Sequence, residues 1–289
     1  MQFPELKYDF AFNRIEIADN LSIAYREEGD ANSPSLLFIH GLSSYIPAWS
    51  KLIPLLKNKF RCIAIDLPGY GKSSGGIFSG TMEFYSNSIA KFIIGLGIEK
   101  VTLVGHSMGG HIALKTGLNF PDLVDKLILL APAGIEIFNE EEINKIIKFN
   151  TPEMFFKIGN DQIKSNYALN FYNMPADTEP MIRDRINMKE WKNFFNYCTI
   201  VSNSLKGMLE DPVLEKLHLL SRKSLILFGR NDRLIPNQIL HKDLSPESIG
   251  EAAASLIPDS KLIMIDHCGH FIPFEKEKTV CAEMVDFIG

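Results

Sequence analysis

Short, continuous apolar runs recur along the chain, and longer stretches with apolar residues at helical spacing separate them. Each run is four residues long and almost entirely apolar. This pattern is typical of strands that are buried on both faces, because a parallel sheet carries helices on each side. The runs lie at residues 36–39, 62–65, 101–104, 127–130, 225–228 and 262–265.

The stretches between these runs predict the helices of the fold. Apolar residues recur at helical spacing over residues 46–57, 82–96, 108–119 and 275–288. Strand and helix therefore alternate along most of the chain. This order predicts an α/β fold with a mostly parallel sheet and helices on both of its faces.

The first part of the chain follows a different pattern. Residues 14–17 and 21–25 alternate polar and apolar side chains on either side of Asp19 and Asn20. Such alternation around a turn predicts an antiparallel hairpin at the edge of the sheet. Together with the apolar runs, the hairpin gives a predicted sheet of eight strands.

The alternation of strand and helix stops between Gly134 and about Asp211. This stretch is polar, helical sequence with many aromatic residues and no strand-like run. A helical insertion between two strands of a finished sheet costs little loop-closure entropy. We therefore predict a core of residues 1–134 and 212–289 and an inserted helical cap of residues 135–211. Some of the aromatic side chains are expected to face the site below, which favours an apolar substrate.

Composition and charge narrow the range of partners. The chain has 289 residues, 46% of them hydrophobic, which is enough to bury a large core. The net charge of −5 and the scattered Lys and Arg residues provide no basic surface of the kind that binds nucleic acid. We expect a small apolar substrate and no nucleic acid partner, and the sequence leaves the oligomeric state open.

The cysteines and the hydropathy pattern indicate in which cellular compartment the protein is found. The cysteines are far apart, and their spacing matches neither a zinc site nor a disulfide framework, which suits a reducing environment. The N-terminus lacks the basic head and apolar stretch of an export signal. Every apolar run is much shorter than the roughly 20 residues that cross a bilayer. We therefore predict a cytoplasmic protein without stable membrane insertion.

Residues Gly105-His106-Ser107-Met108-Gly109 carry the clearest chemistry in the chain. They match the G-x-S-x-G motif and lie between a predicted strand and a predicted helix, where this motif belongs. The serine of the motif lies on a sharp, strained turn, and only glycine fits two residues to either side. The following helix points its first amides at the oxygen that becomes charged in acyl transfer. Ser107 is the predicted nucleophile, and the N–H of Met108 is a predicted oxyanion donor.

A serine hydroxyl needs a histidine base and an orienting carboxylate to become a nucleophile. Asp232 and His270 each follow a predicted strand, and the carboxyl ends of parallel strands meet at one edge of the sheet. The sequence therefore predicts a Ser107, Asp232 and His270 triad. Asp66 and Asp266 are the alternative acids.

Six other histidines compete for the role of base: His40, His106, His111, His218, His241 and His267. His40 ends a strand and is expected to shape the loop that follows. His106 is expected to point into the sheet. His267 is the main alternative base, and as a zinc-binding pair His267 and His270 would need further ligands, which the sequence does not offer.

The loop after residues 36–39 is expected to supply the second oxyanion donor. Gly41 gives this loop flexibility, and the N–H of Leu42 is the candidate group. Residues 66–73 contain Gly-Lys-Ser but lack the first glycine of a phosphate-binding loop. We interpret residues 66–73 as a rigid loop that lines the site.

The chain resembles the α/β-hydrolase superfamily, in the capped subgroup that contains serine esterases and lipases, from about Leu21 to Phe287. The resemblance implies the α/β-hydrolase sheet with a helical cap, a hydrolytic triad, and chemistry that requires no cofactor or metal. The matching motifs are His40-Gly41, residues 66–71, residues 105–110, residues 229–232 and Gly269-His270.

The identity of the predicted nucleophile, a serine, narrows the range of possible reactions. Haloalkane dehalogenases and epoxide hydrolases of this superfamily carry aspartate where this chain has Ser107. Proline iminopeptidases have an oxyanion loop richer in glycine and proline than residues 40–43. We therefore expect a hydrolase of carboxylic esters that forms an acyl-enzyme on Ser107.

Two other functions stay open. Meta-cleavage C–C bond hydrolases usually have a small polar residue directly after the His-Gly pair and an aromatic residue after the catalytic histidine. Leu42 does not match the first feature, and Phe271 matches the second only in part. In the predicted cap, Arg183 and Arg185 are candidates to bind a substrate carboxylate, although we expect them to be solvated surface charges. A non-catalytic ligand receptor of the same fold is the other alternative. The role of residues 241–248, in an interface or in a loop, is also open.

Overall fold

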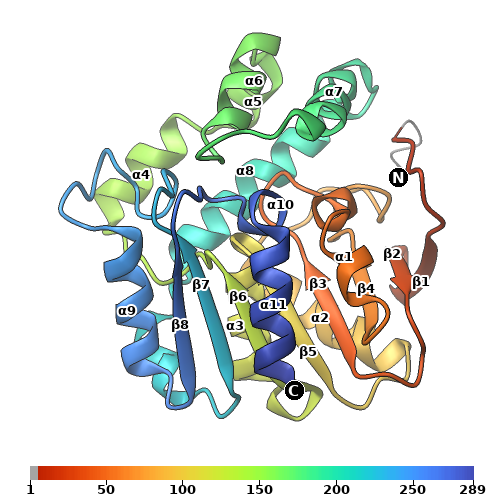
Figure 1. Ribbon diagram of the computed structural model, residues 1–289. Coiled ribbons are helices and arrows are strands. Elements are labelled where there is room, and N and C mark those ends of the chain that lie inside the picture. Colours follow the sequence, from red (N-terminus) through yellow and green to blue (C-terminus); the bar gives the residue numbers. More distant parts are fainter. Residues whose placement is uncertain (1–5) are drawn as a thin grey trace.

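Within residues 6–289, which the computed structural model describes, an eight-stranded sheet forms the centre of the molecule (Figure 1). The first five residues belong to the N-terminus that was predicted to lack an export signal, and they lie outside the described residues. The strand order is β1-β2-β4-β3-β5-β6-β7-β8. The strands are β1 (Asn13–Ala18), β2 (Leu21–Glu28), β3 (Ser35–Ile39), β4 (Arg61–Ile65), β5 (Val101–His106), β6 (Val124–Leu130), β7 (Ser224–Gly229) and β8 (Ser260–Ile265).

Strands β3 to β8 pair with one another in parallel. At one edge of the sheet, β2 pairs antiparallel with both β1 and β4. All of the apolar runs in the sequence lie within β3 to β8, and the alternating segments form the β1–β2 hairpin. Strands β5 and β7 are buried along their whole length, as expected for strands with helices on both sides. The predicted fold class is therefore confirmed.

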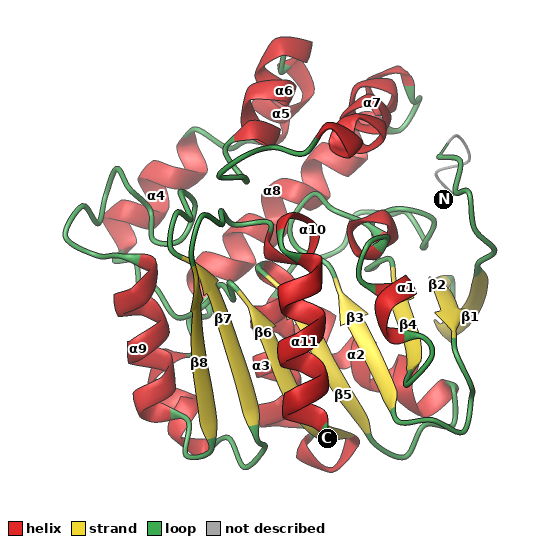
Figure 2. Ribbon diagram, in the orientation of Figure 1, coloured by secondary structure: helices red, strands yellow, loops and turns green. Residues whose placement is uncertain are grey.

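Helices cover both faces of the sheet (Figure 2). Helices α1 (Ile53–Leu56) and α11 (Glu277–Ile288) lie on one face, and α2 (Met82–Gly95) and α3 (Met108–Asn119) lie on the other. Helix α9 (Pro246–Leu256) packs on β7 and β8, and the short α10 (Ile272–Glu275) precedes α11. In the described part of the chain, no helix combines the length and the apolar character needed to cross a membrane.

The chain between β6 and β7 lies over the carboxyl ends of the parallel strands, at the top of Figure 1. We call residues 135–211 the upper segment. Thr151 at the start of α5 accepts a hydrogen bond from a backbone N–H, and Asn139 does the same in a capping box at the start of α4. The helices of this segment are α4 (Glu140–Lys148), α5 (Pro152–Lys157), α6 (Asn160–Ala168), α7 (Glu179–Asn187) and α8 (Phe194–Glu210).

Some helix boundaries differ from the sequence-based prediction. The predicted helix over residues 46–57 is a 3₁₀ turn, Ile46–Trp49, followed by α1, because Pro47 and Pro54 each open a new helical turn and cannot donate the hydrogen bonds of a continuous helix. The predicted helix over residues 275–288 is interrupted at Lys276, between α10 and α11.

Residues 241–248, whose role the sequence left open, divide between a loop and a helix. Ser245 caps α9 in a capping box with Ser248, and Pro246 occupies the first turn of that helix. His241, in the preceding loop, contacts the upper segment. The second half of this stretch is therefore the start of α9, a helix that the sequence analysis did not predict.

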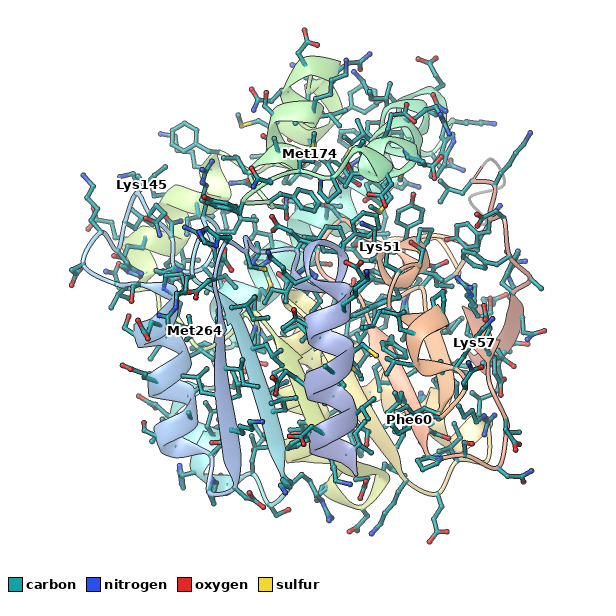
Figure 3. The ribbon with its side chains drawn as sticks, viewed as in Figure 1. Lys51, Lys57, Phe60, Lys145, Met174 and Met264 are labelled. Atoms are coloured by element: carbon teal, nitrogen blue, oxygen red, sulfur yellow. The ribbon has the colours of Figure 1, made fainter. Side chains whose placement is uncertain are left out.

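Ion pairs join the upper segment to the core. Nζ of Lys51 lies 2.9 Å from Oδ2 of Asp177 and 4.2 Å from the centroid of the Phe274 ring. Figure 3 shows Lys51 at the top of the core, below the helices of the upper segment. At the end of the segment, Nζ of Lys115 lies 2.6 Å from Oδ2 of Asp211. The turn before α7 and the end of α8 are thus tied to the core.

His241 forms a third link of this kind. Its Nδ1 lies 2.5 Å from Oε1 of Glu136, its Nε2 lies 3.4 Å from Oε1 of Glu142, and its ring stacks on Phe138. Burial lowers the pKa of His241, but the hydrogen bonds and negative charges of the two glutamates raise it by more, so the net shift is upward. His241 therefore bridges the start of the upper segment to the loop before α9.

We predict that His241→Gln destabilises the protein more at pH 6 than at pH 9. The pKa of His241 is raised above 6.5 in the folded protein, so the stabilisation is fully present below pH 6.5 and is lost as the pH rises through the folded value. Chemical denaturation of both proteins at the two pH values measures the difference. An equal loss at both pH values would contradict the ionic bridge.

Candidate active site

Ser107 lies at the sharp turn between β5 and α3. Its backbone has φ 54° and ψ −119°, in the left-handed half of conformational space that a residue with a side chain rarely adopts. Its N–H donates to the carbonyl oxygen of Leu130 at 3.0 Å, and its own carbonyl oxygen accepts from Ala133 at 3.1 Å. The β6 side of the sheet therefore holds this strained residue in place.

The two glycines of the motif allow the turn to pack this closely. A Cβ on Gly105 would lie 2.3 Å from the carbonyl oxygen of Gly109, and a Cβ on Gly109 would lie 2.0 Å from the carbonyl oxygen of Ile39. Both distances are far below van der Waals contact, and the neighbouring atoms belong to the backbone, which cannot rotate away. The predicted role of these glycines therefore has a direct steric basis.

His270 and Asp232 lie next to each other at the carboxyl edge of the sheet. Nδ1 of His270 is 2.7 Å from Oδ2 of Asp232, and both side chains are buried. Oδ1 of Asp232 accepts from the N–H groups of Leu234 at 2.8 Å and Ile235 at 3.1 Å. Because the carboxylate is fixed by these donors, it can orient the imidazole and leave Nε2 to act as base.

The loop that carries His270 is fixed from both sides. The N–H of Phe271 donates to the carbonyl oxygen of Asn170 in the upper segment at 2.8 Å, and the N–H of Gly269 donates to Oε2 of Glu275 at 2.8 Å. Nε2 of His106 lies 2.9 Å from the carbonyl oxygen of His270. The position of the imidazole therefore depends on both the core and the upper segment.

Leu42 lies in the loop after β3, and Met108 directly follows Ser107 in the chain. Leu42 follows Gly41, whose added Cβ would lie 3.1 Å from Cβ of Ser107, and Met108 is the first residue of α3. Within residues 6–289, neither the Leu42 N–H nor the Met108 N–H donates a hydrogen bond to another protein group. Two free amides beside a serine hydroxyl match the requirement of an oxyanion hole.

The structure gives the other histidines different roles. His40 accepts at Nε2 from the N–H of Leu67 at 3.0 Å, and burial lowers its pKa to about 4, so it is a neutral loop anchor, as expected. His106 stacks on Phe271, and burial lowers its pKa well below the usual range. His267, the main alternative base, is exposed to solvent.

The alternative acids also lie away from the imidazole. Asp266 is exposed and pairs with Arg230 at 2.8 Å. Asp66 is buried and accepts from Tyr8 Oη at 2.6 Å and from the N–H groups of Ile46 and Lys72. Burial raises the pKa of Asp66 to about 6, and these donors oppose the shift. Asp232 is therefore the carboxylate that the structure brings to His270.

A cavity of about 550 Å³ separates these residues from the upper segment. Ser107 and His270 lie in its wall, and most of its lining is apolar. The upper segment also contributes polar residues to the lining, which the sequence analysis did not single out because nothing in their local sequence distinguishes them from surface residues. They are Glu136, Asn150, Asn166, Tyr167 and Asn170.

The two arginines of α7 differ in environment. Arg183 is exposed and pairs with Glu179 one turn away, as expected for a solvated charge. Arg185 lines the cavity, and its guanidinium carbon lies 4.7 Å from the centroid of the Tyr197 ring. Its Nη1 is buried and makes no hydrogen bond within the described part of the chain. The expectation of a solvated charge is therefore wrong for Arg185.

The described residues give less support to metal chemistry or to a cysteine nucleophile. Over residues 6–289, no three His, Cys, Asp or Glu side chains gather in a way that could hold a metal ion. The cysteines are free thiols, and burial raises the pKa of Cys268, which lies two residues before His270, and of Cys198, which lines the cavity. These thiols are poor nucleophiles, because only the thiolate attacks.

Residues 34–277 match the family model described as alpha/beta hydrolase fold. The chain belongs to the α/β-hydrolase family. It is therefore a hydrolase, and the two glycines, the strand-to-helix serine and the strand-end His–Asp pair occupy the places that this fold provides.

Individual relatives of this α/β-hydrolase are similar over nearly their whole length. An uncharacterised hydrolase of Bacillus subtilis (strain 168), YugF, is 29% identical over 93% of this chain and 95% of its own. A 2-hydroxy-6-oxononadienedioate/2-hydroxy-6-oxononatrienedioate hydrolase of Pseudomonas putida is 25% identical over 96% of this chain and 95% of its own. A solved structure described as a probable hydrolytic enzyme from Pseudomonas aeruginosa PAO1 has a TM-score of 0.87 at 20% identity, covering 100% of this chain and 97% of its own.

We predict that Gly109→Ala lowers the stability of this α/β-hydrolase by about 3 kcal/mol or more, because the added Cβ meets backbone on β3. Gly159→Ala is the matched control, since a Cβ there meets nothing within 4 Å and its φ is −75°. Thermal unfolding of the two variants measures the effect. Equal melting temperatures would show that the turn tolerates a side chain at residue 109.

Proposed function

We propose that this α/β-hydrolase cleaves carboxylic esters through an acyl-enzyme on Ser107. The observation that carries the proposal is the 2.7 Å contact between His270 Nδ1 and Asp232 Oδ2 in the wall of a largely apolar cavity that also contains Ser107. A positioned base, an orienting acid and a strained serine are the components of acyl transfer.

The reaction follows from the placement of these groups. His270 takes the proton from Ser107 Oγ as the oxygen attacks the ester carbonyl, and Asp232 stabilises the imidazolium that forms. The N–H groups of Leu42 and Met108 bind the oxyanion. His270 then protonates the departing alcohol. In the second half of the cycle it activates a water molecule, which releases the acid and restores Ser107.

We further propose that residues 135–211 act as a cap between two parts of the core, residues 1–134 and 212–289. The upper segment supplies most of the cavity wall opposite Ser107, including Phe155, Phe194 and Val201. An apolar wall favours an apolar acyl or alcohol group, because its transfer from water is the main source of binding free energy. The free thiols support a cytoplasmic location.

A second candidate is hydrolysis of a C–C bond next to a ketone, and Arg185 favours it. A buried guanidinium with an unused donor is costly unless a ligand pairs with it. A carboxylate on a substrate in the cavity would pair with Arg185. The related Pseudomonas putida protein is named for hydrolysis of a dioate, which is a substrate with carboxylates.

The first test is labelling with a fluorophosphonate, followed by turnover of p-nitrophenyl esters of increasing chain length. We expect labelling and multiple turnover by the wild type and neither by Ser107→Ala. Asp232→Asn should keep the fold and lose about 10⁴-fold in kcat, because the imidazole then adopts the wrong tautomer.

The outcomes separate the possible functions. Labelling without ester turnover would contradict the esterase proposal and leave C–C hydrolysis or ligand binding. Full activity of Ser107→Ala would contradict the assignment of the nucleophile. Circular dichroism of each variant shows whether a loss of activity reflects a loss of fold.

We predict that Arg185→Gln discriminates between acidic and neutral substrates. For an ester that carries a free carboxylate, KM should rise by about 30-fold, the equivalent of roughly 2 kcal/mol for one lost buried charge pair. For a neutral ester of the same length, KM should change little. The matched control is Arg183→Gln, an exposed arginine two residues away. Equal effects on both esters would show that Arg185 does not bind a carboxylate.

A further inference from the structure

Two hydrogen bonds on adjacent residues anchor the end of the oxyanion loop, residues 41–45. On the core side, the N–H of Ile46 donates to Oδ1 of Asp66 at 2.8 Å. On the other side, the buried hydroxyl of Tyr45 donates to Oδ2 of Asp184 in α7 at 2.7 Å. The loop that carries the Leu42 amide is therefore held partly by the core and partly by the upper segment.

The two anchors differ in rigidity. Asp66 is fully buried in the core and accepts three hydrogen bonds, so the end of the loop that it holds is fixed. Asp184 is half-buried and belongs to α7, which lies on the far side of the cavity from the sheet. The position of Tyr45 therefore depends on where α7 lies.

The part of the loop that precedes these two adjacent anchors has a strained conformation. Ser43 has φ 59°, in the left-handed region, and the N–H of Ser44 closes a turn onto the carbonyl oxygen of Gly41 at 3.2 Å. A residue with a side chain stays in this region only when its surroundings hold it there. If the Tyr45 anchor is lost, the turn can relax, and the Leu42 amide rotates with it.

Helix α7 carries both the loop anchor and a group that faces the substrate. Asp184 binds Tyr45, and the adjacent Arg185 lines the cavity. A ligand that holds Arg185 also fixes Asp184, because the two residues share one turn of one helix. Oxyanion donors act only when they lie about 2.7–3.1 Å from the oxyanion, so a small shift of the loop changes the rate.

We propose that Tyr45 and Asp184 are positioning residues that align the Leu42 amide with the oxyanion, and that they couple the position of α7 to the rate of acyl transfer. The inference rests on the proposed function, because it requires Leu42 to bind the oxyanion. Tyr45 is not one of the described residues that line the large cavity. Its hydroxyl therefore acts through the loop and not by touching the substrate.

The test compares variants that remove the hydrogen bond with one that keeps it. Tyr45→Phe removes the donor, Asp184→Leu removes the acceptor, and Asp184→Asn retains an acceptor oxygen. For a small neutral p-nitrophenyl ester, we expect the first two to lose about tenfold in kcat with KM unchanged within about twofold, a partial loss of one oxyanion donor. The rate of fluorophosphonate labelling should fall by the same factor. Asp184→Asn should restore both values to near those of the wild type.

The matched control is Tyr85→Phe. The Tyr85 hydroxyl is buried and lies 2.8 Å from Oγ of Ser204 in α8, so it also joins the core to the upper segment but without touching the oxyanion loop. We expect this control to lower the melting temperature and to leave kcat and the labelling rate unchanged.

Each possible result of these measurements either supports or overturns the inference. Wild-type kcat and labelling rate in Tyr45→Phe would overturn the inference, and so would an equal loss in Tyr85→Phe, since general loosening would then account for the effect. A rise in KM with unchanged kcat would also overturn it. Failure of the wild type itself to label is a different result, because it removes the proposed function and the inference together.

Discussion

The close approach of the β5–α3 turn to the neighbouring strands is the constraint on which the site depends. The Ser107 N–H bonds to Leu130 on β6, and Gly109 packs against the carbonyl oxygen of Ile39 on β3. A strained residue of this kind costs about 1–3 kcal/mol, which the burial of three adjacent strands offsets. The same packing that stabilises the sheet therefore fixes the nucleophile between the loops that follow β3 and β6.

The parts of this structure that follow from local sequence could be predicted. The buried strands are continuous apolar runs, and a parallel strand end places whatever residue follows it at one edge of the sheet. Ser107, Asp232 and His270 each follow such a run, so their placement at one edge of the sheet required no knowledge of the loops. The hairpin at the sheet edge was equally visible, because one of its faces is polar.

The parts that depend on tertiary packing could not be predicted. Arg183 and Arg185 are both cations on one helix, but two residues turn the helix by about 200°, so they face opposite ways. Which of them faces the cavity is decided by how α7 packs on the core. The bond from Tyr45 to Asp184 spans 139 positions in the sequence, and neither residue stands in a motif. Helix α9 was missed although a capping box and Pro246 mark its start in the sequence.

The upper segment contacts both loops that carry the proposed catalytic groups. It holds the loop of His270 through the carbonyl oxygen of Asn170, and it holds the proposed oxyanion loop through Asp184. The proposed base and the proposed oxyanion donor are therefore both held in place by the same group of helices. A substrate that packs poorly against the upper segment therefore displaces the groups that act in the transition state. It has less effect on the groups that only bind the substrate. Such an enzyme discriminates between substrates through kcat more than through KM, because binding energy is used to align the catalytic groups.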